Sequence, residues 1–319
     1  MGSLYEQKIK KLEKNRKSKL DNNSHKLKLN LIKSINAHMD WINLVSKFPF
    51  GNIISVSNDK SIKIYDMNYN IIQHIQNAHT RSINYVDIKD ENNFVTCSND
   101  KSIKTWIKKE NKFILNKSII NAHNDEIYKV IYYSNEKLIS YSYDGIIKIW
   151  EENINNYQLI TSLKHSNFIY SILLIQDKNL LISSDSNGTK LWNINNFELI
   201  KYFEEAKCDE LNGLDRIDKE RIIIIGNETL IIISLLEKKI IKEIKTNFSY
   251  YGISSIEEKG LFLGGRYNDI LVFRNDNYKC IQIIKNAHED YIKGFIHLNN
   301  DFIISYSDDG KIKIWSFEY

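Results

Sequence analysis

The sequence predicts an all-β fold, a seven-bladed β-propeller that is closed by an N-terminal strand and preceded by a short basic helix. Three observations carry this prediction. A motif of histidine, turn aspartate and aromatic residue recurs at fixed spacing, the recurrence continues in steps of 40–44 residues, and the segments between are short and β-branched. A chain of 319 residues exceeds a typical domain of roughly 100–150 residues, and a propeller is a usual way to reach that length as one unit.

The repeat is anchored by the tripeptide Asn-Ala-His, which occurs four times and ends at His38, His79, His123 and His288. An aromatic residue follows each histidine after 27 positions, at Tyr65, Trp106, Trp150 and Trp315. A turn aspartate stands six positions before each aromatic residue, at Asp59, Asp100, Asp144 and Asp309. A serine stands two positions before each aspartate, at Ser57, Ser98, Ser142 and Ser307. His165 and Trp192 repeat the 27-residue spacing around an irregular turn.

Two weaker copies fill the gap and end at Ile233 and Phe273. The terminal positions are then 65, 106, 150, 192, 233, 273 and 315. The fifth and sixth repeats lack the histidine, the turn aspartate and the tryptophan. Four short strands per period, repeated seven times, indicate a propeller and not a helical solenoid.

The chain divides into residues 1–25 and residues 26–319. Residues 4–20 are rich in Lys and Glu, and a seam of Tyr5, Ile9, Leu12, Arg16 and Lys19 predicts a helix. That helix is either the end of a self-associating coiled coil or linker, or a solvated basic helix that is marginal in water. Residues 1–3 are typical of an expression remnant.

The ring is expected to close through residues 26–35. The last repeat has no fourth strand, because the sequence stops at Tyr319, four residues after Trp315. Residues 26–35 alternate Leu27, Leu29 and Leu31, as do the segments before the other Asn-Ala-His motifs. We therefore expect this segment to complete the last blade and to remove its open edge.

These motifs resemble the WD-repeat (WD40) family over about residues 26–319, with Asn-Ala-His in place of Gly-His. Tyr65-Asp66, Trp150-Glu151 and Trp192-Asn193 stand where the family has Trp-Asp. The resemblance implies a structural hydrogen-bonded chain in each matched blade, from aspartate to histidine to serine to tryptophan. A hydrolase triad or a metal site is disfavoured, because such a site is needed once and this constellation recurs around the ring.

The resemblance also implies a partner-binding top face, lined by three positions per blade. In blades one to three these are Trp41, Asn43, Asn58, Ser82, Asn84, Asn99, Glu126, Tyr128 and Tyr143, with Arg81 adjacent. In blades four to seven they are Phe168, Tyr170, Ser186, Glu210, Asn212, Gly226, Ser249, Tyr251, Arg266, Tyr291, Lys293 and Asp308. Seven of the positions are aromatic, which favours a peptide or protein partner. Alternatively, some rings pack within the blades. Arg266 and Lys293 could pair with an acidic or phosphorylated group.

Composition narrows the remaining classes. Residues 1–28 hold nine Lys/Arg and three Asp/Glu, whereas residues 29–319 hold 35 and 37, so the basicity belongs to the tail and nucleic acid is not expected on the propeller. Three dispersed cysteines favour a reducing compartment, cytoplasmic or nuclear. No stretch is long and apolar enough to insert into a membrane, and no cofactor or metal motif is present.

We therefore expect a non-catalytic interaction scaffold or adaptor that binds a protein or peptide segment on its top face. The alternative is the substrate-receptor domain of a larger protein such as a ubiquitin ligase. A ribonucleoprotein scaffold using the basic tail, or an enzyme using Glu126, Glu210 and Asp308 around the channel, is a weaker alternative.

Overall fold

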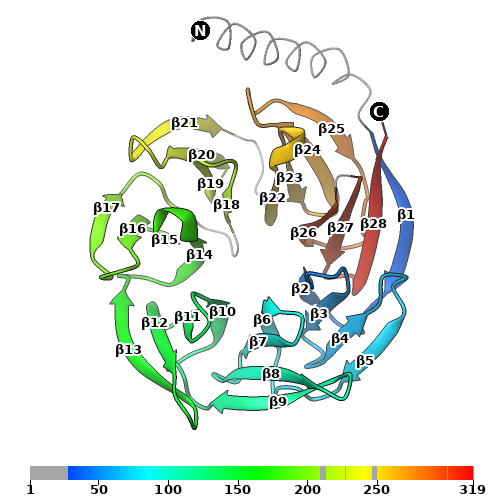
Figure 1. The fold of residues 1–319 in the computed structure, drawn as a ribbon. Coiled ribbons are helices and arrows are strands. Elements are labelled where there is room, and N and C mark those ends of the chain that lie inside the picture. Colours follow the sequence, from blue (N-terminus) through cyan, green and yellow to red (C-terminus); the bar gives the residue numbers. More distant parts are fainter. Residues whose placement is uncertain (1–27, 209–212, 227, 246–249, 300, 319) are drawn as a thin grey trace, which may run out of the picture.

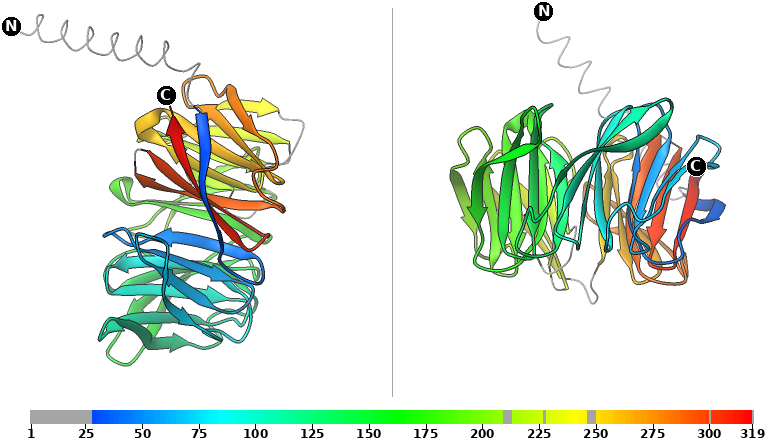
Figure 2. Two further views of the ribbon diagram at one scale, coloured as in Figure 1. Left: turned by 90° about the vertical axis from the view of Figure 1, so that its right-hand side faces the viewer. Right: turned by 90° about the horizontal axis from the view of Figure 1, so that it is seen from below.

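The computed structural model describes residues 28–318 apart from residues 209–212, 227, 246–249 and 300. The described residues form seven antiparallel four-stranded sheets, set as blades around a central opening (Figure 1). Seen edge-on, the blades form a short cylinder (Figure 2). The seven-bladed propeller predicted from the sequence is confirmed. The helix predicted within residues 1–25, and the boundary between residues 25 and 26, lie outside the described residues.

In the first six blades, four consecutive strands run from the central opening outward. Blade one has β2 (Ile42–Lys47), β3 (Ile53–Ser57), β4 (Ile62–Tyr65) and β5 (Ile71–Ile75). Blade two has β6 (Ile83–Asp90), β7 (Asn93–Ser98), β8 (Ile103–Lys109) and β9 (Lys112–Ile119). Blade three has β10 (Ile127–Tyr132), β11 (Lys137–Ser142), β12 (Ile146–Glu152) and β13 (Tyr157–Lys164).

Blades four to six repeat this order. Blade four has β14 (Ile169–Ile175), β15 (Leu180–Asp185), β16 (Gly188–Asn193) and β17 (Leu199–Phe203). Blade five has β18 (Leu214–Arg216), β19 (Arg221–Gly226), β20 (Thr229–Ser234) and β21 (Lys239–Lys245). Blade six has β22 (Gly252–Ile256), β23 (Leu261–Arg266), β24 (Asp269–Arg274) and β25 (Cys280–Ile284). The 3-10 turns η1 (Gln176–Lys178) and η2 (Glu257–Lys259) follow the inner strands of blades four and six.

Blade seven is built from both ends of the chain. Its inner strands are β26 (Ile292–Asn299), β27 (Phe302–Ser307) and β28 (Lys311–Glu318), and β1 (Lys28–Asn36) is its outer strand. Lys28 pairs with Glu318 and Asn36 with Lys311, so β1 lies antiparallel beside β28 (Figure 1). The predicted closure of the ring by an N-terminal strand is confirmed, with the strand ending one residue later than expected.

The core lies between neighbouring blades. The second strand of a blade is apolar on both faces because a blade packs against each of them, and all five residues of β3 are buried. One core cluster joins Ile182 and Leu191 of blade four to Ile222 and Ile224 of blade five. This face-to-face packing removes the apolar surface of both blades from water, which is the main favourable contribution to the fold.

The outermost strand pair of every blade contains a β-bulge at the same place. It lies beside the residue that the sequence marks as the end of each repeat, at positions 65, 106, 150, 192, 233, 273 and 315. A bulge inserts one unpaired residue and increases the local twist. Ile233 and Phe273 share this position with the tryptophans, so blades five and six keep the predicted register although their motifs are weak.

Candidate partner-binding face

Among the described residues, five blades contain a buried chain of four hydrogen-bonded side chains. In blade two, His79 Nδ1 lies 3.0 Å from Asp100 Oδ2 and His79 Nε2 lies 2.8 Å from Thr96 Oγ1. Trp106 Nε1 donates to the same threonine oxygen at 2.9 Å. The chain therefore links the turn at the top of the blade to the third strand, and each member uses its partner's free donor or acceptor.

The same chain recurs in the four other blades. Its histidine–aspartate distances span 2.8–3.1 Å and its histidine–hydroxyl distances 2.6–2.8 Å. The members are His38–Asp59–Ser55–Tyr65, His123–Asp144–Ser140–Trp150, His165–Asp185–Ser183–Trp192 and His288–Asp309–Ser305–Trp315. These histidines, aspartates and aromatic residues therefore lie in continuous hydrogen-bonded chains within their blades.

The serine assigned to this chain from the sequence was wrong by two residues. Ser57, Ser98, Ser142 and Ser307 do not lie between the histidine and the aromatic residue; instead each hydroxyl accepts the backbone N–H of the turn aspartate. The linking hydroxyl belongs to the residue two positions earlier, such as Ser55 or Thr96. Residues two apart share a face of a strand, so the sequence pattern alone did not distinguish them.

Burial and hydrogen bonding determine the protonation of the histidines and aspartates in these hydrogen-bonded chains. Burial lowers the pKa of His79, His123, His165 and His288, although each contacts an aspartate. Burial by itself would raise the pKa of Asp309, but hydrogen bonds from His288 and two backbone N–H groups lower it to about 2. In these four blades the lowered pKa of the histidine favours a neutral imidazole, and the lowered pKa of its aspartate partner favours an ionised carboxylate.

A repeated lysine was missed by the sequence analysis. It follows each turn aspartate by four or five residues, and its Nζ donates to the carbonyl just before the histidine. The lysines are Lys63, Lys104, Lys148, Lys190 and Lys313. The sequence signal was available, since the motif Ile-Lys-Ile-Tyr at 62–65 recurs with variations in the other repeats.

Several top-face asparagines connect neighbouring blades. Asn43 Nδ2 donates to Asn58 Oδ1 at 2.7 Å and to the Ile83 carbonyl of blade two at 2.9 Å. Asn84 Nδ2 donates to Asn99 Oδ1 and to the Ile127 carbonyl of blade three. These amides hold the inner strands together around the channel, so their amide groups already have partners within the propeller.

Five of the seven predicted top-face aromatic residues gather in two clusters. In the blade-3/4 cluster, Tyr143 lies 5.5 Å from Tyr128 and stacks on Phe168 with ring centroids 4.0 Å apart. In the blade-6/7 cluster, Tyr251 lies 4.7 Å from Tyr291. Aromatic pairs at these separations stabilise one another beyond their burial.

The blade-6/7 cluster has a third ring that the sequence analysis missed. Tyr267 lies 5.9 Å from Tyr251 and 5.5 Å from Tyr291. It is 53% exposed, against 37% for Tyr291, 40% for Phe168 and 47% for Trp41. In contrast, Tyr170 is partly buried and packs on a core cluster, as the alternative of packing within the blades expects.

The charged top-face residues are mostly paired within the propeller. Lys293 Nζ lies 3.1 Å from Asp308 Oδ2, and Arg266 lies 2.8 Å from Asp269. Glu126 accepts a hydrogen bond from Tyr128. Arg81 is exposed, Ser82 and Ser186 are half-buried and Gly226 is buried, whereas Glu210, Asn212 and Ser249 lie outside the described residues.

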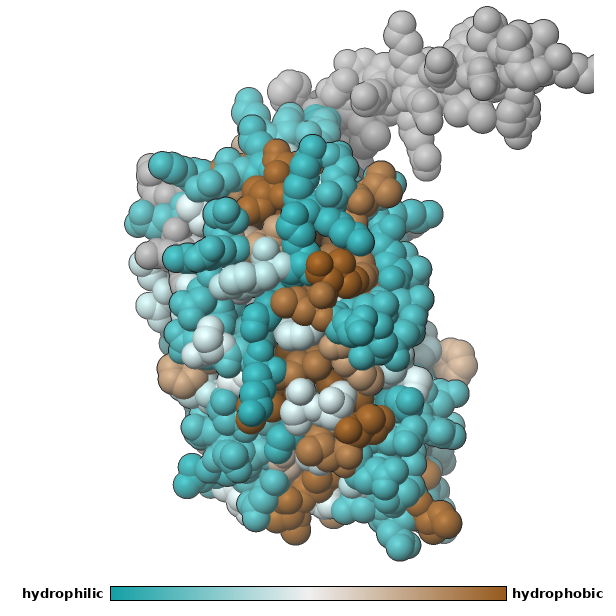
Figure 3. All heavy atoms as spheres, turned by 90° about the vertical axis from the view of Figure 1, so that its left-hand side faces the viewer, coloured by the Kyte–Doolittle hydropathy of each residue, from teal (hydrophilic) through white to brown (hydrophobic). Residues whose placement is uncertain are grey.

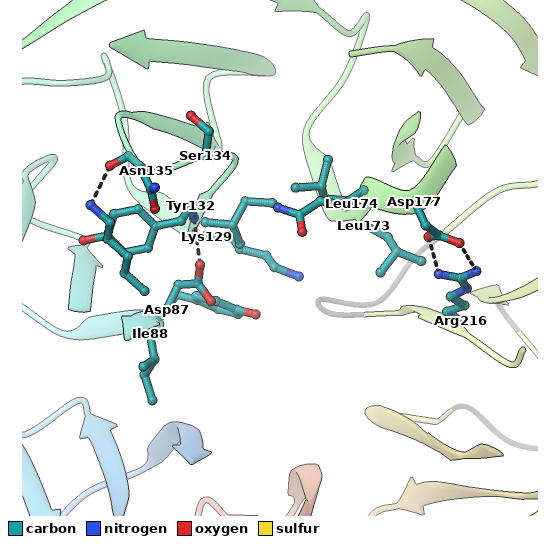
Figure 4. A pocket seen from close by; sticks show the side chains of 14 residues that line it. Asp87, Ile88, Lys129, Tyr132, Ser134, Asn135, Leu173, Leu174, Asp177 and Arg216 are labelled. Carbon is teal, nitrogen blue, oxygen red and sulfur yellow. Dashed lines mark hydrogen bonds and ion pairs between the residues drawn. The ribbon is translucent and has the colours of Figure 1, made fainter. Parts of the chain in front are cut away.

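A cavity of about 750 Å³ opens into the channel near the C-terminal ends of the inner strands, away from the top face. Lys129 is buried there, donates to the Ile172 carbonyl at 2.9 Å and lies over the Tyr85 ring. Burial lowers the pKa of Lys129 to about 8 and raises that of Asp87 to about 6. Figure 4 shows Asp87 on one side of the opening and the Asp177–Arg216 ion pair on the other.

The outer rim is a second exposed surface. Each outer strand presents aliphatic side chains at the bulge, and in blades three to five these include Leu159, Ile160, Leu199, Ile200 and Ile241. Figure 3 shows such apolar groups between hydrophilic ones along one side of the molecule. Their exposures of 36–48% resemble those of the top-face rings, so exposure alone does not rank the two surfaces.

The described ranges of the chain contain no group of three or more His, Cys, Asp or Glu side chains placed to hold a metal ion. No helix among them has the length and apolar character needed to cross a membrane.

Comparison with known proteins identifies the repeat. The family described as WD domain, G-beta repeat, matches residues 29–66, 71–106, 115–151 and 278–316. Each matched segment begins in or just before the outer strand of one blade and ends at the third strand of the next, which lies in blade one, two, three or seven.

Two curated proteins are also similar over part of their length. One is peptidyl-prolyl cis-trans isomerase 9 of Schizosaccharomyces pombe, 30% identical over 84 residues that make up 26% of this chain and 14% of that protein. The other is regulator of rDNA transcription protein 13 of Saccharomyces cerevisiae, 25% identical over 132 residues, or 35% of this chain and 70% of that protein. The four repeat matches and the seven closed blades together show that this chain belongs to the WD-repeat (WD40) family of β-propellers.

Proposed function

We propose that the chain is a non-catalytic interaction scaffold that holds a protein or peptide segment on its top face, across the blade-6/7 cluster and Trp41. WD-repeat propellers are typically scaffolds of this kind. The observation that carries the proposal is the grouping of Trp41, Tyr267 and Tyr291, each 37–53% exposed, on three adjacent blades. Tyr and Trp dominate binding hot spots because they bury a large area and lose little conformational entropy.

The proposal also concerns the cellular compartment and the place of this propeller within a larger protein. We place the chain in the nucleus or cytoplasm, and its similarity to a regulator of rDNA transcription supports a nuclear role. The chain spans 14% of the isomerase that it resembles, so that enzyme's catalytic activity does not enter the proposal. A receptor domain within a larger protein would use the same face.

The test compares two variants of the full chain as baits in cell lysate, with capture measured by quantitative mass spectrometry. The top-face variant carries Trp41→Ala, Tyr267→Ala and Tyr291→Ala. The rim variant carries Leu159→Ala, Leu199→Ala and Ile241→Ala, which remove apolar groups of similar exposure. Circular dichroism checks that both fold.

We expect partners of the unmodified chain to be lost from the top-face variant and kept by the rim variant. Loss from the rim variant alone would contradict the proposal and assign binding to the outer strands. Equal capture by both variants would contradict it too.

A further inference from the structure

We infer that the top face accepts a cationic side chain of the partner, preferably an arginine, which displaces Lys293 from a site formed by Trp41 and Asp308. The inference rests on the proposed function and specifies the chemistry of the bound segment. It follows from what Lys293 does in the structure, from an unsatisfied carboxylate oxygen beneath it, and from the charge around them.

Lys293 occupies a site with the chemistry of a cation receptor. Its ammonium lies 3.1 Å from Asp308 Oδ2 and 5.2 Å from the centroid of the Trp41 ring. Carboxylates and aromatic faces both attract cations in proteins, the first through charge-assisted hydrogen bonds and the second through cation–π contact. The lysine side chain is 30% exposed, whereas the aspartate side chain beneath it is 2% exposed.

Asp308 is left incompletely paired by this lysine. Its Oδ1 is buried and has no hydrogen-bond partner within the part of the chain that the structure describes, while Oδ2 contacts Lys293. Burial accordingly raises the pKa of Asp308 to about 6, against the opposing effect of Lys293. A guanidinium group can donate to both carboxylate oxygens at once, which the single ammonium of Lys293 does not do here.

The groups around the site favour a cation over an anion. Asp40 and Asp290 are exposed, and each accepts the backbone N–H of the neighbouring aromatic residue, Trp41 or Tyr291. Glu289 adds a third exposed carboxylate and is paired with Lys311. An acidic or phosphorylated segment would have to approach these carboxylates and break the Lys293–Asp308 pair.

Exchange of one cation for another is feasible because Lys293 is a flexible, partly exposed side chain. When it swings into solvent, it leaves the Trp41 face and Asp308 Oδ2 without their cation, and a guanidinium that takes its place has a second N–H group to offer to Oδ1. The ammonium therefore competes with the ligand. Its removal should tighten binding, which a purely structural ion pair would not do.

The experiment records the indole N–H signals of the ¹⁵N-labelled full chain during titration with small probes. The protein has five tryptophans, and four of them donate their indole N–H to buried hydroxyls. Trp41 is the exposed one, and Trp41→Phe identifies its signal. The four buried signals report that each variant is folded.

The probes are Nα-acetylarginine amide, Nα-acetyllysine amide, Nα-acetylnorleucine amide and Nα-acetylphosphoserine amide. We expect a saturable shift of the Trp41 signal with the arginine probe, a weaker one with lysine and none with the other two. Asp308→Asn should raise the Kd of the arginine probe at least about tenfold, because a hydrogen bond to a charged group is lost.

The decisive variant is Lys293→Met, which keeps the side-chain length and removes the ammonium. We expect it to lower the Kd for the arginine probe several-fold, whereas Lys311→Met, the same charge change beside the site, should leave the Kd nearly unchanged. Equal tightening by both variants, weaker binding to Lys293→Met, a preference for phosphoserine, or no saturable shift with any probe would overturn the inference. Partners that bind the top face without this charge preference would leave the proposed function standing.

Discussion

The hydrogen-bonded chain of blade two makes a quantitative prediction about stability. Thr96→Val keeps the shape of the side chain and removes the hydroxyl that contacts both His79 and Trp106. His79 is 1% exposed and Trp106 is 5% exposed, so water does not replace the lost partner. Each buried polar group left unsatisfied costs about 1–3 kcal/mol.

Two groups lose their partner at once, so we expect Thr96→Val to lower the free energy of unfolding by about 2–6 kcal/mol. Ser98→Ala, which removes the hydroxyl first assigned to this chain, should cost less. Its hydroxyl makes longer contacts, 3.0 Å from the Asp100 N–H and 3.3 Å from the Arg81 carbonyl. A typical net hydrogen-bond contribution of about 1 kcal/mol is expected there.

The assay is urea unfolding followed by circular dichroism, with the midpoint and slope fitted together so that a change in cooperativity is detected. Thr161→Val on the half-exposed part of β13 is the matched control and should change stability by less than about 0.5 kcal/mol. If Thr96→Val lowers the free energy of unfolding no more than Thr161→Val, or less than Ser98→Ala, the hydrogen-bonded chain of blade two does not stabilise the fold as argued.

Two further predictions concern charged groups. Lys104→Met removes the ammonium that donates to the Ala78 carbonyl at 2.7 Å, and thermal and urea unfolding should show that the free energy of unfolding falls by about 1–3 kcal/mol. The control Lys242→Met changes an exposed lysine and should lower it by less than about 0.5 kcal/mol. Equal effects of the two variants would contradict the role of Lys104. Burial raises the pKa of Asp87 to about 6, so between about pH 4 and 6 the folded chain binds one more proton, at Asp87, than the unfolded chain. The free energy of unfolding therefore decreases as the pH rises through this window. As the pH rises over that window, the free energy of unfolding of Asp87→Asn should therefore increase relative to that of the unmodified chain by up to ~1.4 kcal/mol per pH unit. The exposed Asp301→Asn should show no such increase. Parallel pH profiles for the Asp87 variant and the unmodified chain would show that Asp87 is not buried as described.

The order of the blades could be predicted from the sequence because it depends on local spacing. His79 and Trp106 lie 27 positions apart, within a single supersecondary unit, and this unit recurs wherever the same residues recur at that spacing. The pairing of β1 with β28 was also predictable, because a ring with a missing strand needs one from the other end of the chain.

The linking hydroxyls and the state of the top-face rings could not be predicted in this way. Ser55 and Ser57 face the same side of one strand, and only the placement of His38 decides which of them it contacts. Tyr170 lies in β14 and packs on the core cluster of blades four and five, whereas Tyr267 lies in the turn after β23 and is exposed.

The sequence by itself therefore determined the number of blades, their register and the closure of the ring. These features depend on the periodic placement of apolar and turn residues along the chain. Only the tertiary structure decided which side chains meet across blades. Lys293 lies over Trp41, 252 positions earlier in the chain, because ring closure brings blade seven against blade one. Contacts of this kind depend on the curvature of the whole ring and the orientation of individual side chains, which no local pattern specifies.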